Sequence, residues 1–112
     1  MVNHFHERVR LLRRLAAKSA RETARAAGFP APTQWSLLES SGRDPRLSTI
    51  LRVAQAFGVN IEWLATGGGP AFRLHPDLDL RSRAGRKAAA AIVQAALAAA
   101  ANDNAAASTE AA

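Results

Sequence analysis

Few side chains in this sequence have the grouping that catalysis requires. His4 and His6 lie two residues apart without a third ligand nearby, and the chain contains no cysteine. This set is too small for a tetrahedral metal site. Asp77 and Asp79 are not accompanied by a nucleophile or base in a segment expected to be ordered, so they do not form a carboxylate pair for acid–base chemistry. We therefore predict no enzyme activity, no catalytic residue, no metal site and no cofactor.

Binding groups, in contrast, gather between Ser19 and Pro45. This stretch reads S-A-R-E-T-A-R-A-A-G-F-P-A-P-T-Q-W-S-L-L-E-S-S-G-R-D-P, which places a glutamine amide and several guanidinium groups around one short helix. Guanidinium groups pair with phosphates, and a glutamine amide can hydrogen-bond adenine N6 and N7 together. The pattern therefore favours contact with double-stranded DNA.

The charge of the chain points in the same direction. The 112 residues include 15 Lys/Arg and 9 Asp/Glu, a net charge of +6, and most of the excess lies in residues 1–69. A basic surface favours polyanions, nucleic acid before acidic membrane, while a merely solvated basic face would have the same composition. Neither a signal peptide nor a bilayer-spanning run is visible, so we expect no membrane association and a cytoplasmic location.

The segments that must position these groups are predicted to be short helices. Ser19 and Glu22 form a capping box at the start of one helix, and Gly28 is suited to ending it. Gly42 and Gly58 are expected to end later helices, and Asn60 to cap the last short one. Apolar periodicity and these signals predict helices over 7–17, 20–27, 32–40, 47–57 and 61–65.

The same periodicity predicts which faces are buried. In the first helix Val9 and Leu12 are expected in the core, with the arginines of that helix elsewhere. Trp35 and Leu38 are expected on the inner side of helix 32–40. The inner stripe of helix 47–57 is expected to consist of Leu47, Ile50, Leu51, Ala54 and Phe57.

The second half of the chain divides by composition. Residues 1–67 are expected to be the folded domain and 68–83 a linker, because T-G-G-G-P is rich in glycine. Alanine propensity predicts a helix over 84–101, and residues 102–112 are expected to be a disordered tail.

Five helices with this spacing resemble the lambda-repressor-like (Cro/repressor, XRE) helix-turn-helix family over about residues 7–67. S-A-R-E-T-A-R-A-A-G-F is similar to the family's S-Q-x-E-L-A-x-x-x-G-V, and P-R-L-S-T-I-L-R-V-A-Q-A-F-G-V is similar to P-S-L-x-T-L-x-K-I-A-x-A-L-G-V. Glu39 to Pro45 keeps the family's six-residue step. The turn after Gly28 has one extra residue, and Ala20 replaces a glutamine that usually contacts phosphate. The resemblance implies an all-α, five-helix DNA-binding domain.

The resemblance also implies which residues touch DNA. A recognition helix reads bases through outward side chains near its N-terminus, which here are Thr33, Gln34, Ser36 and Leu37. Phosphate contacts are expected from Arg21, Arg43 and Arg46. Three further basic residues are equally compatible with phosphate contact or with a solvated face: Arg13, Arg14 and Lys18.

We therefore predict a sequence-specific, DNA-binding transcriptional regulator, a phage-type repressor acting as a homodimer on an operator. Trp63 and the segment after the linker are candidates for the dimer contact. A stripe on helix 84–101 is a third candidate, although a solvated, frayed helix is slightly favoured there; the stripe is Ala89, Val93, Leu97 and Ala100. The alternative function is an antitoxin or adaptor that binds a partner protein through its C-terminal tail.

Overall fold

The computed structural model describes residues 4–111, with side chains described as far as Asn104. Within these bounds the chain forms helices and no strand, which confirms the predicted all-α class. The five helices predicted before residue 67 are present with bounds within two residues of the prediction. The helices are α1 Phe5–Ala16, α2 Ala20–Ala27, α3 Pro32–Ser40, α4 Leu47–Phe57, α5 Ile61–Thr66 and α6 Arg83–Ala111.

The predicted start and end signals act locally as expected at α2. The Ser19 hydroxyl accepts the Glu22 backbone N–H at 3.2 Å, and the Ser19 N–H donates to Glu22 Oε1 at 3.2 Å. Gly28 ends the helix with φ +84°, a left-handed conformation that favours glycine. Gly42 does not end α3. The residue that follows the last residue of this helix is Ser41, whose backbone is extended.

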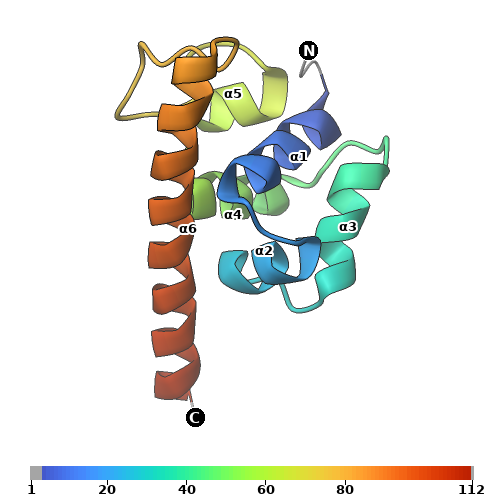
Figure 1. The fold of residues 1–112 in the computed structure, drawn as a ribbon. Coiled ribbons are helices and arrows are strands. Elements are labelled where there is room, and N and C mark those ends of the chain that lie inside the picture. The colour runs from blue at the N-terminus through green and yellow to red at the C-terminus, as the bar shows by residue number, and fades with distance from the viewer. Residues whose placement is uncertain (1–3, 112) are drawn as a thin grey trace.

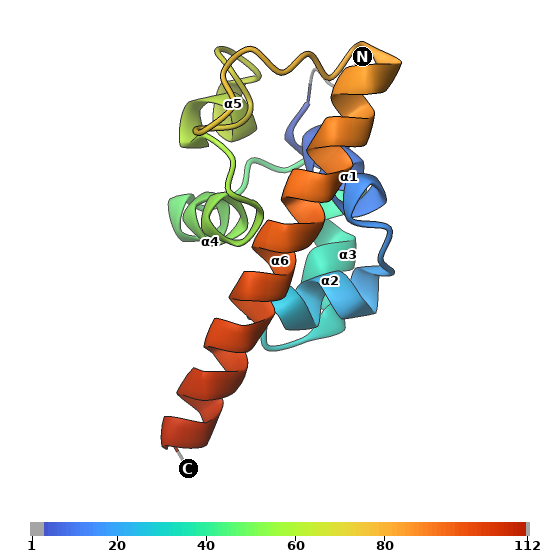
Figure 2. The same ribbon diagram turned by 60° about the vertical axis from the view of Figure 1, so that its left-hand side comes forward.

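The helices surround one core, to which all six contribute. Figures 1 and 2 show α6 running along one side of α1, α2 and α4, with which it packs. The largest fully buried side chains include Leu12, Trp35, Phe57 and Leu64. Each such side chain stabilises the fold by roughly 1.5–3 kcal/mol relative to an exposed one.

The alanine-rich helix α6 is part of this core, which corrects the sequence-based interpretation. Ala89, Val93 and Leu97 have no exposed surface, because they face α1, α2 and α4 of the same chain. Ala100, the last member of the stripe, is half-buried and packs against the same core. The stripe is therefore packed within its own chain and is not available to pair with a second copy. The helix also continues to Ala111, which corrects the expected disordered tail over 102–111; Ala112 lies outside the described residues.

Two side-chain amides explain how α6 holds this position. Gln94 Nε2 donates to the Leu15 carbonyl at 3.1 Å, and Asn104 Nδ2 donates to the Ala26 carbonyl at 2.8 Å. Both carbonyls belong to the last turn of their helices, where no intrahelical partner is available. Thus α6 supplies hydrogen-bond donors to the ends of both α1 and α2.

The predicted linker 68–83 is also partly packed. Phe72 and Ala71 are buried, and Phe72 forms an isolated antiparallel bridge with Val59. Asn60 precedes α5 but its side chain does not cap that helix. Instead its Nδ2 donates to the Pro70 carbonyl at 2.7 Å and its backbone N–H to the Ala71 carbonyl at 2.8 Å. The glycine-rich segment is therefore fastened to the domain by Asn60.

Two expectations about buried faces are wrong. Leu47 is 67% exposed, because the buried side of α4 is centred on Val53, Ala54 and Phe57 and leaves out the first residue of the helix. Ala54 and Phe57 of the predicted stripe are buried, and Ile50 packs against the core. Arg8, expected outside the core, is 2% exposed. Its Nε donates to the Leu64 carbonyl at 2.8 Å, at the end of α5. Burial lowers the pKa of the Arg8 guanidinium, and the nearby carboxylate of Glu7 opposes that effect.

Within residues 4–111, no helix combines the length and the apolar character needed to cross a membrane.

Candidate nucleic-acid interface

The inner face of α3 is fixed by aromatic contacts. Trp35 has no exposed surface, as predicted. Its ring lies edge-on to Phe29 with centroids 5.9 Å apart, and it contacts Phe57 of α4 at 5.7 Å. Because Phe29 belongs to the turn between α2 and α3, the turn and the helix share one packing unit. The opposite face of α3 is thereby directed outward.

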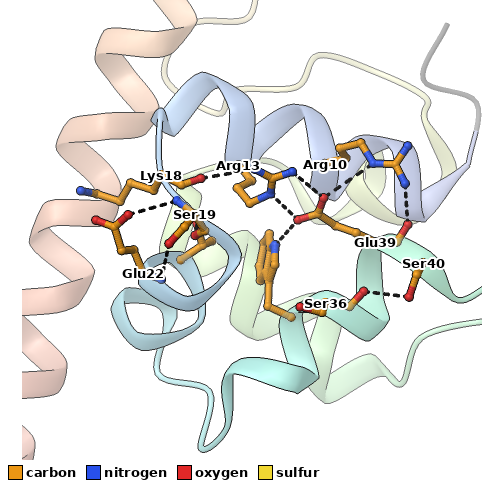
Figure 3. Close-up of polar contacts among 10 residues, drawn as sticks. Arg10, Arg13, Lys18, Ser19, Glu22, Ser36, Glu39 and Ser40 are labelled. Atoms are coloured by element: carbon orange, nitrogen blue, oxygen red, sulfur yellow. Dashed lines mark hydrogen bonds and ion pairs between the residues drawn. The ribbon is translucent and has the colours of Figure 1, made fainter.

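A buried carboxylate holds the C-terminal half of α3 (Figure 3); the sequence marked it only as the start of the Glu39–Pro45 step and gave no sign of its burial. Glu39 is 8% exposed. Arg13 of α1 donates to both of its carboxylate oxygens, Nε to Oε2 at 2.5 Å and Nη2 to Oε1 at 3.0 Å. The indole N–H of Trp35 also donates to Oε2. The carboxylate therefore connects α1 to both turns of α3.

Arg10 adds a second attachment to the same residue. Its Nη2 donates to the Glu39 backbone carbonyl at 2.8 Å, and its Nε lies 3.6 Å from Oε1 (Figure 3). Burial alone raises the pKa of Glu39, but hydrogen bonds from Arg13 and Trp35 and the charges of both arginines outweigh it. The pKa of Glu39 therefore lies below its ordinary value, and the side chain is a carboxylate at neutral pH.

This cluster changes the interpretation of Arg13, one of the possible additional phosphate contacts. Its guanidinium is engaged by Glu39, and its side chain is only 25% exposed. The hydrogen bond to Glu39 is the main reason that the pKa of Arg13 is raised, with burial opposing it. Arg13 therefore stabilises the packing of α1 against α3. Arg14 is exposed and Lys18 is half-buried.

The four side chains predicted to face bases all lie on the exposed side of α3. Thr33, Gln34, Ser36 and Leu37 are exposed, and Leu37 keeps 60% of its surface accessible. They comprise a hydroxyl, an amide, a second hydroxyl and an apolar group, without any basic residue. A base-contacting surface of this kind would rely on the amide for bidentate hydrogen bonds and on Leu37 for thymine methyl groups.

Gln34 is already engaged in the free protein. Its Oε1 accepts the backbone N–H of Ala31, the residue before α3, at 3.2 Å. An alanine side chain cannot return such a bond, so this is one half of a capping box. A bidentate contact with adenine needs both the oxygen and the nitrogen of the amide. The oxygen keeps a second lone pair and the amide nitrogen keeps both of its donors, so the bond to Ala31 orients the side chain without using up its capacity for such a contact.

Exposed arginines lie at both ends of α3. At its start, Arg21 lines a hollow together with Phe29, Pro30 and Pro32. At its end, Arg43 and Arg46 line an open groove of about 650 Å³ together with other residues of α3 and of the following loop. The remaining lining includes Gln34, Leu37, Leu38, Ser41 and Asp44. All three arginines are exposed, and their contact with phosphate remains a prediction.

A further arginine stiffens the turn. Arg52 of α4 donates from Nη1 to the Gly28 carbonyl, and its guanidinium lies 5.5 Å from the centre of the Phe29 ring. The sequence offered no signal for this contact, because Arg52 and Gly28 are far apart in the chain. Phe29 in this turn therefore contacts the Trp35 ring of α3 and the Arg52 guanidinium of α4.

The described part of the chain was also searched for side chains that could bind a metal ion. No group of three or more His, Cys, Asp or Glu side chains that could hold a metal ion occurs there. His4 and His6 stack on each other with ring centroids 5.4 Å apart.

Comparison with known proteins returned no matching family model, no matching curated protein and no matching solved structure.

Proposed function

We propose that this protein is a DNA-binding transcriptional regulator in which α2, the turn 28–31 and α3 form a helix-turn-helix. The observation that carries the proposal is the position of α3. Its inner face is fixed by Trp35 and Glu39, its outer face is polar and exposed, and arginines stand at both of its ends. The order and bounds of α1 to α5 support the lambda-repressor-like arrangement that the sequence predicts.

In this proposal phosphate contacts supply most of the affinity. Arg21, Arg43 and Arg46 neutralise phosphates and release counterions, so binding weakens as salt rises. Asp44 lies in the same loop as two of these arginines and keeps the local positive charge moderate. The proposed location is cytoplasmic.

Base contacts in this proposal come from the outer face of α3. Gln34 hydrogen-bonds adenine through both atoms of its amide, which gives roughly 1–3 kcal/mol of discrimination for a good bidentate pair. Thr33 and Ser36 bind base edges or phosphates, and Leu37 meets a thymine methyl. Because α3 contains no Arg or Lys, it lacks the commonest reader of guanine, and sequence preference is expected to be modest.

As a regulator, the protein would repress transcription by occupying an operator as a homodimer. The alternative, an antitoxin or adaptor with a partner-binding tail, receives less support. It calls for an available C-terminal segment, whereas α6 is packed on its own domain from Ala89 to Asn104. We therefore place DNA binding first.

Selection from random-sequence DNA with the full chain tests the proposal. An enriched sequence, together with affinity that falls steeply with salt, is the expected result. Steep salt dependence without any enriched sequence would overturn specific recognition, and the absence of measurable binding at low salt would overturn the proposal as a whole.

Variants separate the two kinds of contact. Arg43→Ala and Arg46→Ala should each weaken binding to all sequences and reduce the salt slope by about one. Gln34→Ala should instead alter the selected sequence. Arg83→Ala is the matched control, because it removes the same charge at the first residue of α6, away from α3 (Figure 1). An unchanged selected sequence for Gln34→Ala would contradict its role in base recognition.

A further inference from the structure

Two arginines of α2 share a hollow at the start of α3. Arg21 and Arg25 lie four residues apart, so they are neighbours on one side of the helix. Both line a hollow of about 460 Å³. Its other lining residues come from the turn, from the first residue of α3 and from α6, and they are Gly28, Phe29, Pro30, Pro32 and Asn104. The proposed function gives a role to Arg21, but none to Arg25 or Asn104.

The charge of this hollow is positive, because no acidic residue is among those that line it. Arg21 and Arg25 are exposed, and neither side chain forms a hydrogen bond or an ion pair with another residue in the described part of the chain. Glu22 lies between them in sequence, but its carboxylate accepts the Ser19 N–H at 3.2 Å. Glu22 lines a neighbouring hollow, which the two arginines share with Lys18. Two guanidinium groups without a carboxylate acceptor favour an anion in the first hollow.

Asn104 adds an uncharged donor from α6, which packs beside α2 in Figures 1 and 2. Its side chain is half-buried. Nδ2 donates one N–H to the Ala26 carbonyl at 2.8 Å, and the same nitrogen carries a second N–H. Pro30 and Pro32 restrict the backbone of the remaining wall. The hollow therefore has its donors and its shape in place before an anion binds, which lowers the entropic cost of binding.

We propose that this hollow binds a single phosphate group, which the guanidinium groups of Arg21 and Arg25 hold together and to which Asn104 donates its remaining N–H. Guanidinium groups pair with phosphate oxygens through parallel N–H···O bonds, so two of them can engage one phosphate. The source of the phosphate rests on the proposed function. Pro32 is followed directly by Thr33 and Gln34, the residues proposed to face bases. A phosphate in the hollow then belongs to the DNA strand beside those bases.

Binding of inorganic phosphate to the full chain tests the site without DNA. Sodium phosphate added at constant ionic strength should shift the Nε–Hε NMR signals of Arg21 and Arg25 with one common dissociation constant. Arg25→Ala should raise that constant at Arg21 at least about threefold, and Asn104→Ala should raise it less, because an amide carries no charge. Arg83→Ala is the matched control, because it removes an exposed arginine from the first residue of α6, far along the helix from Asn104. The absence of a saturable shift, or an Arg21 signal that responds equally in Arg25→Ala, would overturn the shared site.

Binding to DNA identifies the source of the phosphate. Arg25→Ala should weaken binding to all sequences, and Arg21→Ala combined with Arg25→Ala should reduce the salt slope by about one, because a single phosphate is released. A reduction of about two would mean two separate phosphates and would contradict the shared site. If inorganic phosphate binds but Arg25→Ala leaves the affinity for DNA unchanged, the site takes a free phosphate and its assignment to DNA is wrong. A chain that binds inorganic phosphate but no DNA would keep the site and overturn the proposed function instead.

Discussion

Arg13 of α1 and Glu39 of α3 share two hydrogen bonds, from Nε to Oε2 at 2.5 Å and from Nη2 to Oε1 at 3.0 Å (Figure 3). The pair is mostly buried and sits opposite the exposed face of α3. The two hydrogen bonds fix the C-terminal half of α3 against α1. A bidentate arginine–carboxylate contact is directional. It therefore restrains the orientation of α3 relative to α1, and with it the direction in which the outer face of α3 points.

Removal of one partner of this pair should be costly. Glu39→Ala leaves the Arg13 guanidinium and the Trp35 indole N–H without their acceptor, and we expect a loss of about 3 kcal/mol in the free energy of unfolding. Urea denaturation followed by circular dichroism measures this. Arg13→Ala and the double variant complete a thermodynamic cycle. If the two single losses simply add, the contact does not couple α1 to α3.

The same pair predicts how stability depends on pH. The pKa of Glu39 is below its ordinary value of 4.5 in the folded chain, so the folded state binds fewer protons than the unfolded one. Its stabilisation is therefore complete above about pH 5 and is lost as the pH falls through the folded-state pKa. The stability difference between the wild type and Glu39→Gln should shrink between pH 7 and pH 3. A constant difference would show that the charge of Glu39 contributes nothing.

Local signals explain why the helices were predictable. The capping box at Ser19 and the glycines at 28 and 58 act within a few residues of themselves, so the sequence carries their effect directly. Trp35 was placed in the core by helical spacing alone. The exposed set on α3 follows from the same spacing, because the residues that are not buried on a short helix must face outward.

Long-range contacts explain what was not predictable. Glu39 binds α1, Arg8 binds the end of α5, and Asn104 binds the end of α2, each across 26 or more residues. Such contacts depend on how the helices pack, and composition cannot reveal them. The burial of α6 was missed for a related reason. Alanine on a predicted helix has little burial signal of its own, and only Val93 and Leu97 marked the inner side.

The packing of α6 can be tested through Leu97. Its side chain has no exposed surface, so Leu97→Ala removes buried methyl groups and leaves a cavity, at a cost of about 3 kcal/mol. Leu37→Ala makes the same chemical change at an exposed position and should alter stability by less than about 0.5 kcal/mol. Equal effects in thermal or urea unfolding would contradict the docking of α6 on the domain.

The turn before α3 offers the sharpest test of the long-range contact made by Asn104. Gly28 has φ +84° and Gly58 has φ +68°, so alanine should cost about 1 kcal/mol at either position from backbone conformation alone. A Cβ at Gly58 would lie 3.7 Å from Ala96 Cβ, an ordinary contact. A Cβ at Gly28 would lie 3.0 Å from Asn104 Nδ2, the atom that donates to the Ala26 carbonyl.

Gly28→Ala should therefore destabilise the chain more than Gly58→Ala does, because Asn104 must move and give up a hydrogen bond worth about 1 kcal/mol. In an Asn104→Ala background this extra cost has no source, so Gly28→Ala should then match Gly58→Ala. Urea unfolding of the three single variants and of Gly28→Ala with Asn104→Ala measures both differences. If the cost of Gly28→Ala is the same in both backgrounds, the C-terminal part of α6 does not press on the turn that positions α3.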